Sequence, residues 1–121
     1  MWVTSIRPLP EWGGVVASVA IIDQTDTRAG LFNGSEEPGG KNWARGNRVP
    51  DDLQSSLIAA FNGGFRFDHI KGGYFTEGKE VKKLRDGDAT LGVNLDGKVV
   101  IGEYGRDMTN DGSWLSLRQN L

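Results

Sequence analysis

The order of apolar and polar positions divides the first third of the chain into short predicted strands. Residues 2–6 alternate loosely and end at two prolines, whereas residues 15–22 form a longer apolar run rich in β-branched residues, which we expect to lie centrally in a sheet. A polar turn follows, and residues 27–33 are expected to return as the hairpin partner of that run. Residues 35–47 show little periodicity and indicate a surface loop anchored by Trp43.

The middle of the chain carries the one helix that the pattern clearly predicts. Pro50 suits a first helical position, the two aspartates after it favour the positive end of the helix dipole, and Leu53 and Leu57 share one face. The apolar residues 58–61 then run into residues 62–64, Asn-Gly-Gly, and predict a buried strand that ends in a glycine turn.

Two hairpins are predicted in the second half of the chain, one around a Glu-Gly dipeptide and one around Asp-Gly, a strong short-range hairpin signal. Residues 114–121 fit a short helix as well as a strand. Together the patterns predict a single α+β domain over residues 1–121, mostly antiparallel β-sheet with hairpins and one or two short helices. The arms of the hairpins are residues 74–76 with 79–81, and residues 90–95 with 98–104.

The register of the second hairpin follows from the length assumed for its loop. A two-residue Asp-Gly loop predicts that Val93 pairs with Val100 and Leu91 with Gly102. With that register, Leu95 shares one face with Leu91 and Val93, and we expect this face to lie toward the core.

Composition and charge exclude several classes of protein. The chain has 18 glycines in 121 residues, about twice the usual share of about 7%, which indicates many tight turns. The net charge of -2 gives no electrostatic footprint for nucleic acid, and no apolar run reaches the about 20 residues of a membrane span. The absence of Cys and the single His exclude a disulfide scaffold and a two-His metal site. No signal-peptide pattern follows Met1, and the sequence names no cofactor.

Two segments stand out as candidates for binding or catalysis. Residues 62–64 would let a ligand approach the main chain, with the Asn62 amide as donor and acceptor; a glycine turn in which Asn62 caps its own backbone is the alternative. Arg106 and Asp107 follow a predicted strand end, where an Arg can grip a phosphate and a carboxylate can act as acid or base. A surface ion pair is the alternative there.

Two further groups of polar residues are candidates. Arg118, Gln119 and Asn120 suit polar recognition of a sugar or phosphate, although a solvated helix face would look the same. Several carboxylates precede a glycine and are interpreted as turn residues, whereas Asp68, beside the single His, is less easily explained in that way. Trp43 and Tyr74 could stack on a sugar ring, with burial in a core as the alternative for both.

A series of short motifs runs along nearly the whole chain. Its members are Glu36-Glu37-Pro38-Gly39-Gly40, Trp43, Val49-Pro50, Ala59-Ala60-Phe61-Asn62-Gly63-Gly64-Phe65, Gly72-Gly73-Tyr74, Leu84-Arg85-Asp86-Gly87, Asp96-Gly97, Gly105-Arg106-Asp107 and Arg118-Gln119-Asn120-Leu121. That series resembles the phosphodiester glycosidase family, and most closely its bacterial branch found in actinobacteria. The strongest element of the resemblance is the Asn-Gly-Gly-Phe stretch with the apolar segment before it.

The resemblance implies hydrolysis of the glycosidic bond of a sugar-1-phosphodiester, which releases a sugar and a phosphomonoester. It implies a phosphorylated glycan or sugar phosphodiester as the substrate and an extracellular or cell-envelope location. Carried over by position, the expected substrate-binding residues are Asn62, Gly63, Gly64 and Asn120 together with a phosphate clamp of Arg106 and Arg118. The expected general acid or base is Asp107, with Asp68 as the second candidate.

The resemblance also implies a longer protein. Family members continue into a second half with an Asp-Gly-Gly-Gly-Ser type motif that does not occur here, so we expect a domain truncated at its C-terminus, in which a carboxylate pair lacks one member. Two alternatives stay open: a non-catalytic carbohydrate- or cell-wall-binding module of the same fold, and a structural domain whose glycines are all turn residues. A second copy of the chain is a candidate partner, because it would cover an open sheet edge.

Overall fold

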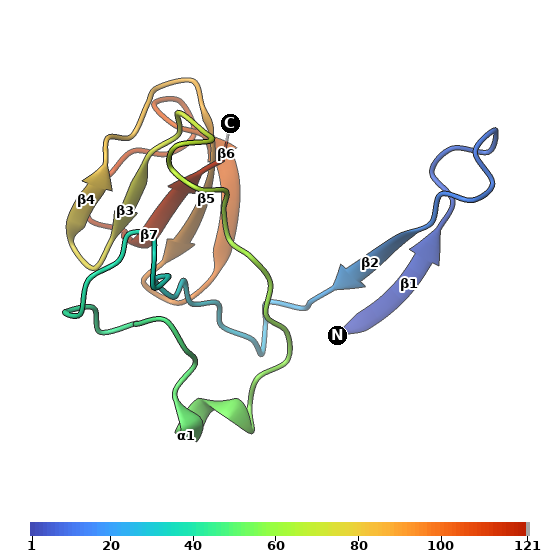
Figure 1. The fold of residues 1–121 in the computed structure, drawn as a ribbon, viewed down its shortest axis with the longest axis horizontal. Coiled ribbons are helices and arrows are strands. Elements are labelled where there is room, and N and C mark those ends of the chain that lie inside the picture. Colours follow the sequence, from blue (N-terminus) through green and yellow to red (C-terminus); the bar gives the residue numbers. More distant parts are fainter. Residues whose placement is uncertain (121) are drawn as a thin grey trace.

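The computed structural model describes residues 1–120 and is built from two antiparallel sheets and one short helix (Figure 1). The predicted fold, mostly antiparallel β-sheet with hairpins and a short helix, is confirmed. The smaller sheet pairs β1 (Trp2–Ile6) with β2 (Ala17–Ile21). The larger sheet has the strand order β4-β3-β7-β5-β6, and its strands are β3 (Tyr74–Thr76), β4 (Lys79–Lys82), β5 (Ala89–Asn94), β6 (Val99–Glu103) and β7 (Trp114–Gln119).

The N-terminal hairpin differs from its prediction in position and in partner. The apolar run at residues 15–22 does form a strand, but β2 lies in a two-stranded ribbon that projects away from the larger sheet, and no other helix or strand of the described chain contacts it (Figure 1). Its partner is β1 rather than residues 27–33, which are irregular; there Ala29 donates its N–H to the carbonyl of Gly97 at 2.7 Å. An apolar run predicts a strand, but it does not identify the strand that pairs with it.

The C-terminal segment, ambiguous in the sequence, is the central strand of the larger sheet. β7 pairs with β3 on one side and with β5 on the other. Leu117 in the middle of β7 is fully buried and lies directly opposite Phe75. The core on this side of the sheet is small and consists of Phe75, Leu84, Met108 and Leu117, with Tyr104 and Trp114 packed against it.

Both hairpins of the second half are confirmed, but the register of the second is one residue away from the prediction. Leu91 pairs with Ile101 and Val93 with Val99, because the loop has three residues rather than two. Gly97 closes it by donating to the carbonyl of Asn94 at 2.9 Å with a φ of 75°, as in a type I turn followed by a bulge. Leu95 is therefore a loop residue, 62% exposed, and not a core residue.

The predicted helix is present, whereas the buried strand expected after it is not. The helix α1 (Asp51–Gln54) is a single turn with no buried residue, and its aspartates occupy the first turn as expected. Residues 58–61 are irregular, and the side chain of Phe61 is 79% exposed. The prediction was wrong because a hydrophobic segment becomes a strand only where a sheet edge pairs with it. In the described part of the chain, no helix has the length and apolar character to cross a membrane.

Replacing Leu117 by Ala should destabilise the larger sheet by about 2–5 kcal/mol, because it removes buried methyl groups from the centre of a small core. The matched control is Ile21→Ala in the projecting hairpin, where a half-exposed side chain should cost less than about 0.5 kcal/mol. Urea denaturation followed by the fluorescence of the tryptophans would measure both. Equal losses of stability in the two variants would contradict the conclusion that the hairpin makes little contact with the core of the larger sheet.

Candidate functional site

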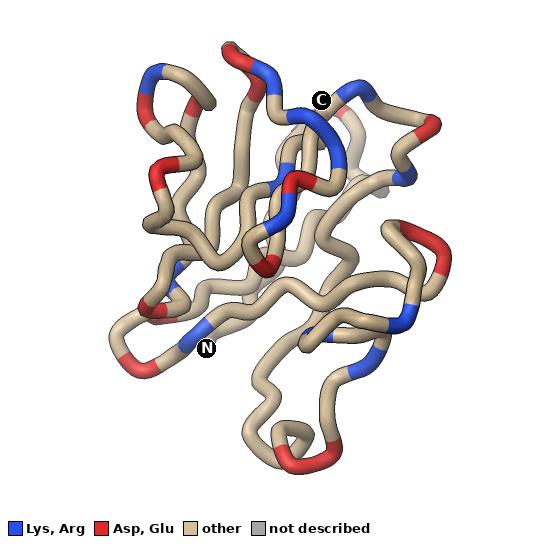
Figure 2. The backbone as a smooth tube through the Cα atoms, turned by 90° about the vertical axis from the view of Figure 1, so that its left-hand side faces the viewer, with Lys and Arg blue, Asp and Glu red and all other residues tan. Residues whose placement is uncertain are grey.

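Arg118 differs from the other Lys and Arg residues of the described chain in being buried. Basic and acidic residues are interleaved along the backbone (Figure 2), and in each ion pair that they form the basic side chain is 48% or more exposed. Arg118 instead lies on the central strand β7, is 7% exposed, and forms no ion pair among the described residues. Its guanidinium stacks on the rings of Phe67 and Tyr74, with its central carbon 4.7 and 5.3 Å from the two centroids.

The Asn-Gly-Gly-Phe segment folds back onto this part of β7. Arg118 donates from Nη2 to the carbonyl oxygen of Phe65, and Asn120 donates from Nδ2 to the carbonyl of Gly63 at 3.1 Å. The Asn120 amide oxygen accepts the Phe65 N–H at 3.3 Å. A Cβ on Gly64 would lie 2.4 Å from Nε of Arg118, so only glycine allows this approach. The structure therefore brings together the predicted cleft segment and two predicted binding residues.

Asn62, at the start of this segment, has a local partner. Its side-chain oxygen accepts the N–H of Gly64 at 3.2 Å, which is the turn that the alternative interpretation describes. The side chains of Asn62 and Asn120 thus shape the segment, and Arg118 provides the charge beside it.

One nitrogen of Arg118 has no hydrogen-bond partner in the part of the chain that the structure describes. Nη1 is buried, and within residues 1–120 it makes no hydrogen bond. Burial lowers the pKa of the Arg118 guanidinium, and the negative charge of Glu37 acts in the opposite direction. The group still remains cationic at any physiological pH. A buried donor without a partner is rare in folded proteins, so a cationic one indicates a position where an anion would be stabilised.

Sequence reasoning missed the residues that hold the segment over the sheet. Glu37 accepts the N–H of Phe67 through Oε2, and Lys82 donates to the carbonyls of Phe67 and Ile70 at 2.8 and 2.7 Å. Glu37 was part of the motif series, but an acidic residue in a glycine-rich loop looks like a turn residue. The group that Glu37 binds, the N–H of Phe67, lies 30 residues further along the chain, so neighbouring residues do not reveal this role.

Strand alternation divides the Arg-Gln-Asn triplet between the two faces of the sheet. Gln119 points to the side opposite Arg118, is fully buried, and makes four hydrogen bonds. Its Oε1 accepts the N–H groups of Gly73 and Arg85 at 2.8 and 3.0 Å, and its Nε2 donates to the Arg85 carbonyl and to Thr90 Oγ1 at 2.9 and 3.0 Å. Gln119 is therefore a structural residue, and binding roles fit only its two neighbours.

The predicted clamp of two arginines is not formed. Gly102 on β6 and Gln119 both pair with Thr90, so all three lie on one face of the sheet. The Asp107 side chain packs against Gly102 on that face, whereas Arg118 lies on the other. Arg106 and Arg118 were predicted to lie together because the sequence does not reveal the path of the loop after β6. This loop crosses the face of the sheet opposite Arg118.

Arg106 and Asp107 instead form a local ion pair at the surface. Arg106 donates from Nε and Nη2 to the two carboxylate oxygens of Asp107, both at 2.9 Å, and its Nη1 lies 2.7 Å from a Glu103 oxygen. The Arg106 hydrogen bonds, with help from the Glu103 N–H, lower the pKa of Asp107 to about 2. A carboxyl with that pKa carries no proton to donate at neutral pH and is a weak base, so the pair corresponds to the alternative interpretation of this motif.

Asp68 lies near the site but not within it. Its carboxylate is exposed, 3.5 Å from Nε of Arg66 and 3.8 Å from Nε2 of His69. It directly follows Phe67, the residue that stacks on Arg118. Among the described residues, no group of three or more His, Asp or Glu side chains is placed to hold a metal ion.

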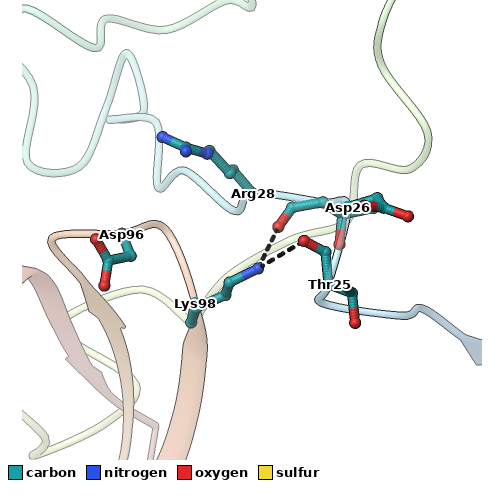
Figure 3. Close-up of a pocket in the computed structure, with 6 residues that line it drawn as sticks. Thr25, Asp26, Arg28, Asp96 and Lys98 are labelled. Carbon is teal, nitrogen blue, oxygen red and sulfur yellow. Dashed lines mark hydrogen bonds between the residues drawn. The ribbon is translucent and has the colours of Figure 1, made fainter.

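A cavity of about 460 Å³ lies away from these residues, beside the turn between β5 and β6 (Figure 3). There Lys98 donates from Nζ to the carbonyls of Thr25 and Thr27 at 3.3 and 3.4 Å, which attaches the segment after β2 to the sheet. Asp26, Arg28 and Asp96 also line it, so positive and negative charges are balanced around the opening. None of the predicted site residues lies here.

Replacing Gln119 by Met should destabilise the protein, because the buried N–H groups of Gly73 and Arg85 would lose their acceptor, at about 1–3 kcal/mol each. Hydrogen exchange at those two amides should accelerate, and urea denaturation should show the lower stability. Gln54→Met, on the exposed helix, is the control and should change neither. Unchanged exchange at Gly73 in the Gln119 variant would refute the structural role.

The carboxyl of Asp107 should titrate near pH 2 when followed by NMR. Because this pKa lies below the ordinary value of 3.8, the stabilisation of the folded state is complete above about pH 4 and is lost as the pH falls through about 2. Arg106→Gln should return the pKa of Asp107 toward 3.8, since it removes the largest cause of the shift, whereas Arg48→Gln should leave it unchanged. A pKa still near 2 without the guanidinium would contradict this account.

Comparison of the chain with models of known protein families, with curated proteins and with solved structures finds no match in any of the three. The resemblance to the phosphodiester glycosidases therefore stays a prediction.

Proposed function

We propose that this chain carries the phosphate-binding part of a phosphodiester glycosidase domain, which hydrolyses the bond between a sugar and a phosphodiester. The observation that supports the proposal is the Arg118 guanidinium, which is buried beside the Asn-Gly-Gly-Phe segment and has one nitrogen that finds no partner among residues 1–120. On this proposal the substrate is a phosphorylated glycan or a sugar phosphodiester, met outside the cell or at its envelope.

The proposed reaction makes limited demands on a general acid. Hydrolysis breaks the bond from the anomeric carbon to the phosphate oxygen; the oxygen of water bonds to that carbon, and the phosphomonoester leaves as an anion. A cation held in a largely buried position stabilises the charge that develops on the leaving oxygen. Arg118 would serve there, while Asn62 and Asn120 would keep Gly63 and Gly64 in place beside it.

The proton from water needs a carboxylate on the Arg118 side of the sheet. Asp107 lies on the other side, and its pKa of about 2 makes it a weak base. Asp68 follows Phe67 in the segment that covers Arg118, and Glu37 binds that segment, so these two are the carboxylates that the proposal would use.

One observation favours the alternative of a non-catalytic carbohydrate-binding module. Neither of the two predicted acid–base residues has a hydrogen-bond partner that would orient it toward Arg118, since Asp107 is paired with Arg106 and Asp68 is exposed. Such a module would keep the anion site and bind its ligand without turnover.

The test is to incubate the full chain with the methyl diester of glucose 1-phosphate, add a phosphomonoesterase, and measure released phosphate. Arg118→Met should lower the rate by about 100-fold or more, because it removes the charge that the leaving group needs. Arg48→Met is the control, since that side chain is 73% exposed and pairs only with Asp51 among the described residues. Thermal denaturation of each variant verifies that it is folded.

The outcomes separate the candidate functions. Binding of the diester without phosphate release, lost in a folded Arg118→Met variant, would establish the binding module. Neither binding nor release by the original chain would overturn both functions and leave the structural domain. Release that is unaffected by Arg118→Met would remove the arginine from the mechanism.

A further inference from the structure

The irregular segment between residues 33 and 47 encloses a second cavity of about 490 Å³. Its side chains are those of Asn33, Ser35, Lys41, Trp43 and Asn47, and three glycines complete the wall. We propose that this cavity binds a pyranose sugar. The assignment of that sugar as part of the substrate rests on the proposed function, whereas the binding itself does not.

The chemistry of the wall matches a sugar ring. Trp43 is half-buried and supplies an aromatic surface for the C–H groups of a pyranose, and the amide of Asn47 and the hydroxyl of Ser35 can donate and accept hydrogen bonds. A few polar groups around an apolar surface are typical of small-molecule sites. The one charged residue in the wall, Lys41, favours a sugar with an acidic substituent over one with a basic substituent.

The tryptophan is held in a fixed orientation. Its indole N–H donates to the carbonyl of Gly39 at 2.7 Å, and Nζ of Lys79 lies 4.8 Å from the ring centroid. Glu77 accepts the N–H groups of Ala44 and Arg45 at 2.9 and 2.8 Å, which fastens the chain directly after Trp43 to the β3–β4 turn. A site that is already ordered loses less conformational entropy when its ligand binds.

The cavity lies one side chain away from Arg118. Tyr74 donates its hydroxyl to Oδ1 of the buried Asn33 at 2.6 Å, and the same tyrosine ring stacks on the Arg118 guanidinium. Asn33 is in turn bound to the backbone, since its Nδ2 donates to the Arg45 carbonyl at 3.0 Å. A sugar site and an anion site thus adjoin across Tyr74, which is the arrangement that a sugar phosphodiester requires.

The test uses the full chain and calorimetric titration with methyl α-glucoside, methyl α-mannoside, methyl α-galactoside and N-acetylglucosamine. We expect at least one to bind saturably, and Trp43→Leu to weaken that binding about tenfold or more, because the aromatic surface that contacts the sugar is lost. Trp12→Leu is the matched control, since Trp12 is 65% exposed in the projecting hairpin and should leave the affinity unchanged.

A second variant guards against misfolding in the first. Lys41 has no hydrogen bond or ion pair among the described residues, so Lys41→Gln should fold normally and should weaken glucose 6-phosphate about threefold or more, without affecting the neutral sugar. Lys71→Gln, at an exposed position outside the cavity, is its control. No binding by any sugar, or equal binding by a folded Trp43→Leu variant, would overturn the sugar site.

Sugar binding and hydrolysis can fail separately. Sugar binding that depends on Trp43, together with absent phosphate release, would leave the cavity assignment intact and remove the proposed catalysis. Phosphate release that depends on Arg118, with no effect of Trp43→Leu on sugar binding, would support the proposed catalysis and remove the cavity assignment. Binding of inorganic phosphate equal to that of glucose 6-phosphate would show that Lys41 attracts an anion only, and would remove the preference for an acidic sugar.

Discussion

Gln119 joins three parts of the larger sheet that are distant in sequence. Its amide bonds to the residue before β3, to the connection between β4 and β5, and to a hydroxyl on β5, and it has no remaining unsatisfied polar atom. Gln119 is fully buried and uses every donor and acceptor of its amide. It therefore fixes the position of β7 relative to β3 and β5. Since consecutive residues of a strand face opposite sides, this interaction also determines where Arg118 and Asn120 point.

The site depends on that constraint for its charge. Arg118 is 7% exposed, and burial of a charged group costs free energy. If the surrounding strands and loops were flexible, they would move so that the guanidinium could reach water. Here β7 lies between β3 and β5, the rings of Phe67 and Tyr74 stack on the guanidinium, and the Asn-Gly-Gly-Phe segment covers it. The apolar core on one face of the sheet therefore supports a buried positive charge on the other.

Features encoded by neighbouring residues could be predicted from the sequence, and features that depend on distant partners could not. The Glu-Gly and Asp-Gly turns located both hairpins, and Pro50 with the aspartates after it located the helix. The partner of β2, the exposed state of residues 58–61 and the one-residue change of register depend on which edges and bulges the whole fold provides. The same distinction applies to the site: the order of motifs joined Asn62–Gly64 with Arg118 and Asn120, but it also joined Arg106, which strand alternation places on the other face.

The projecting hairpin has a consequence for any measurement made on this protein. β1 and β2 contain no charged residue, and each has one edge that pairs with no strand among residues 1–120. Trp2 and Ile21 are 75% and 50% exposed. Uncharged edge strands of this kind can pair with one another between molecules. Self-association through the hairpin would then increase with protein concentration, and weak ligands are usually measured at high protein concentration. Dilute protein with an excess of ligand is therefore the condition under which binding to the larger sheet can be measured without self-association.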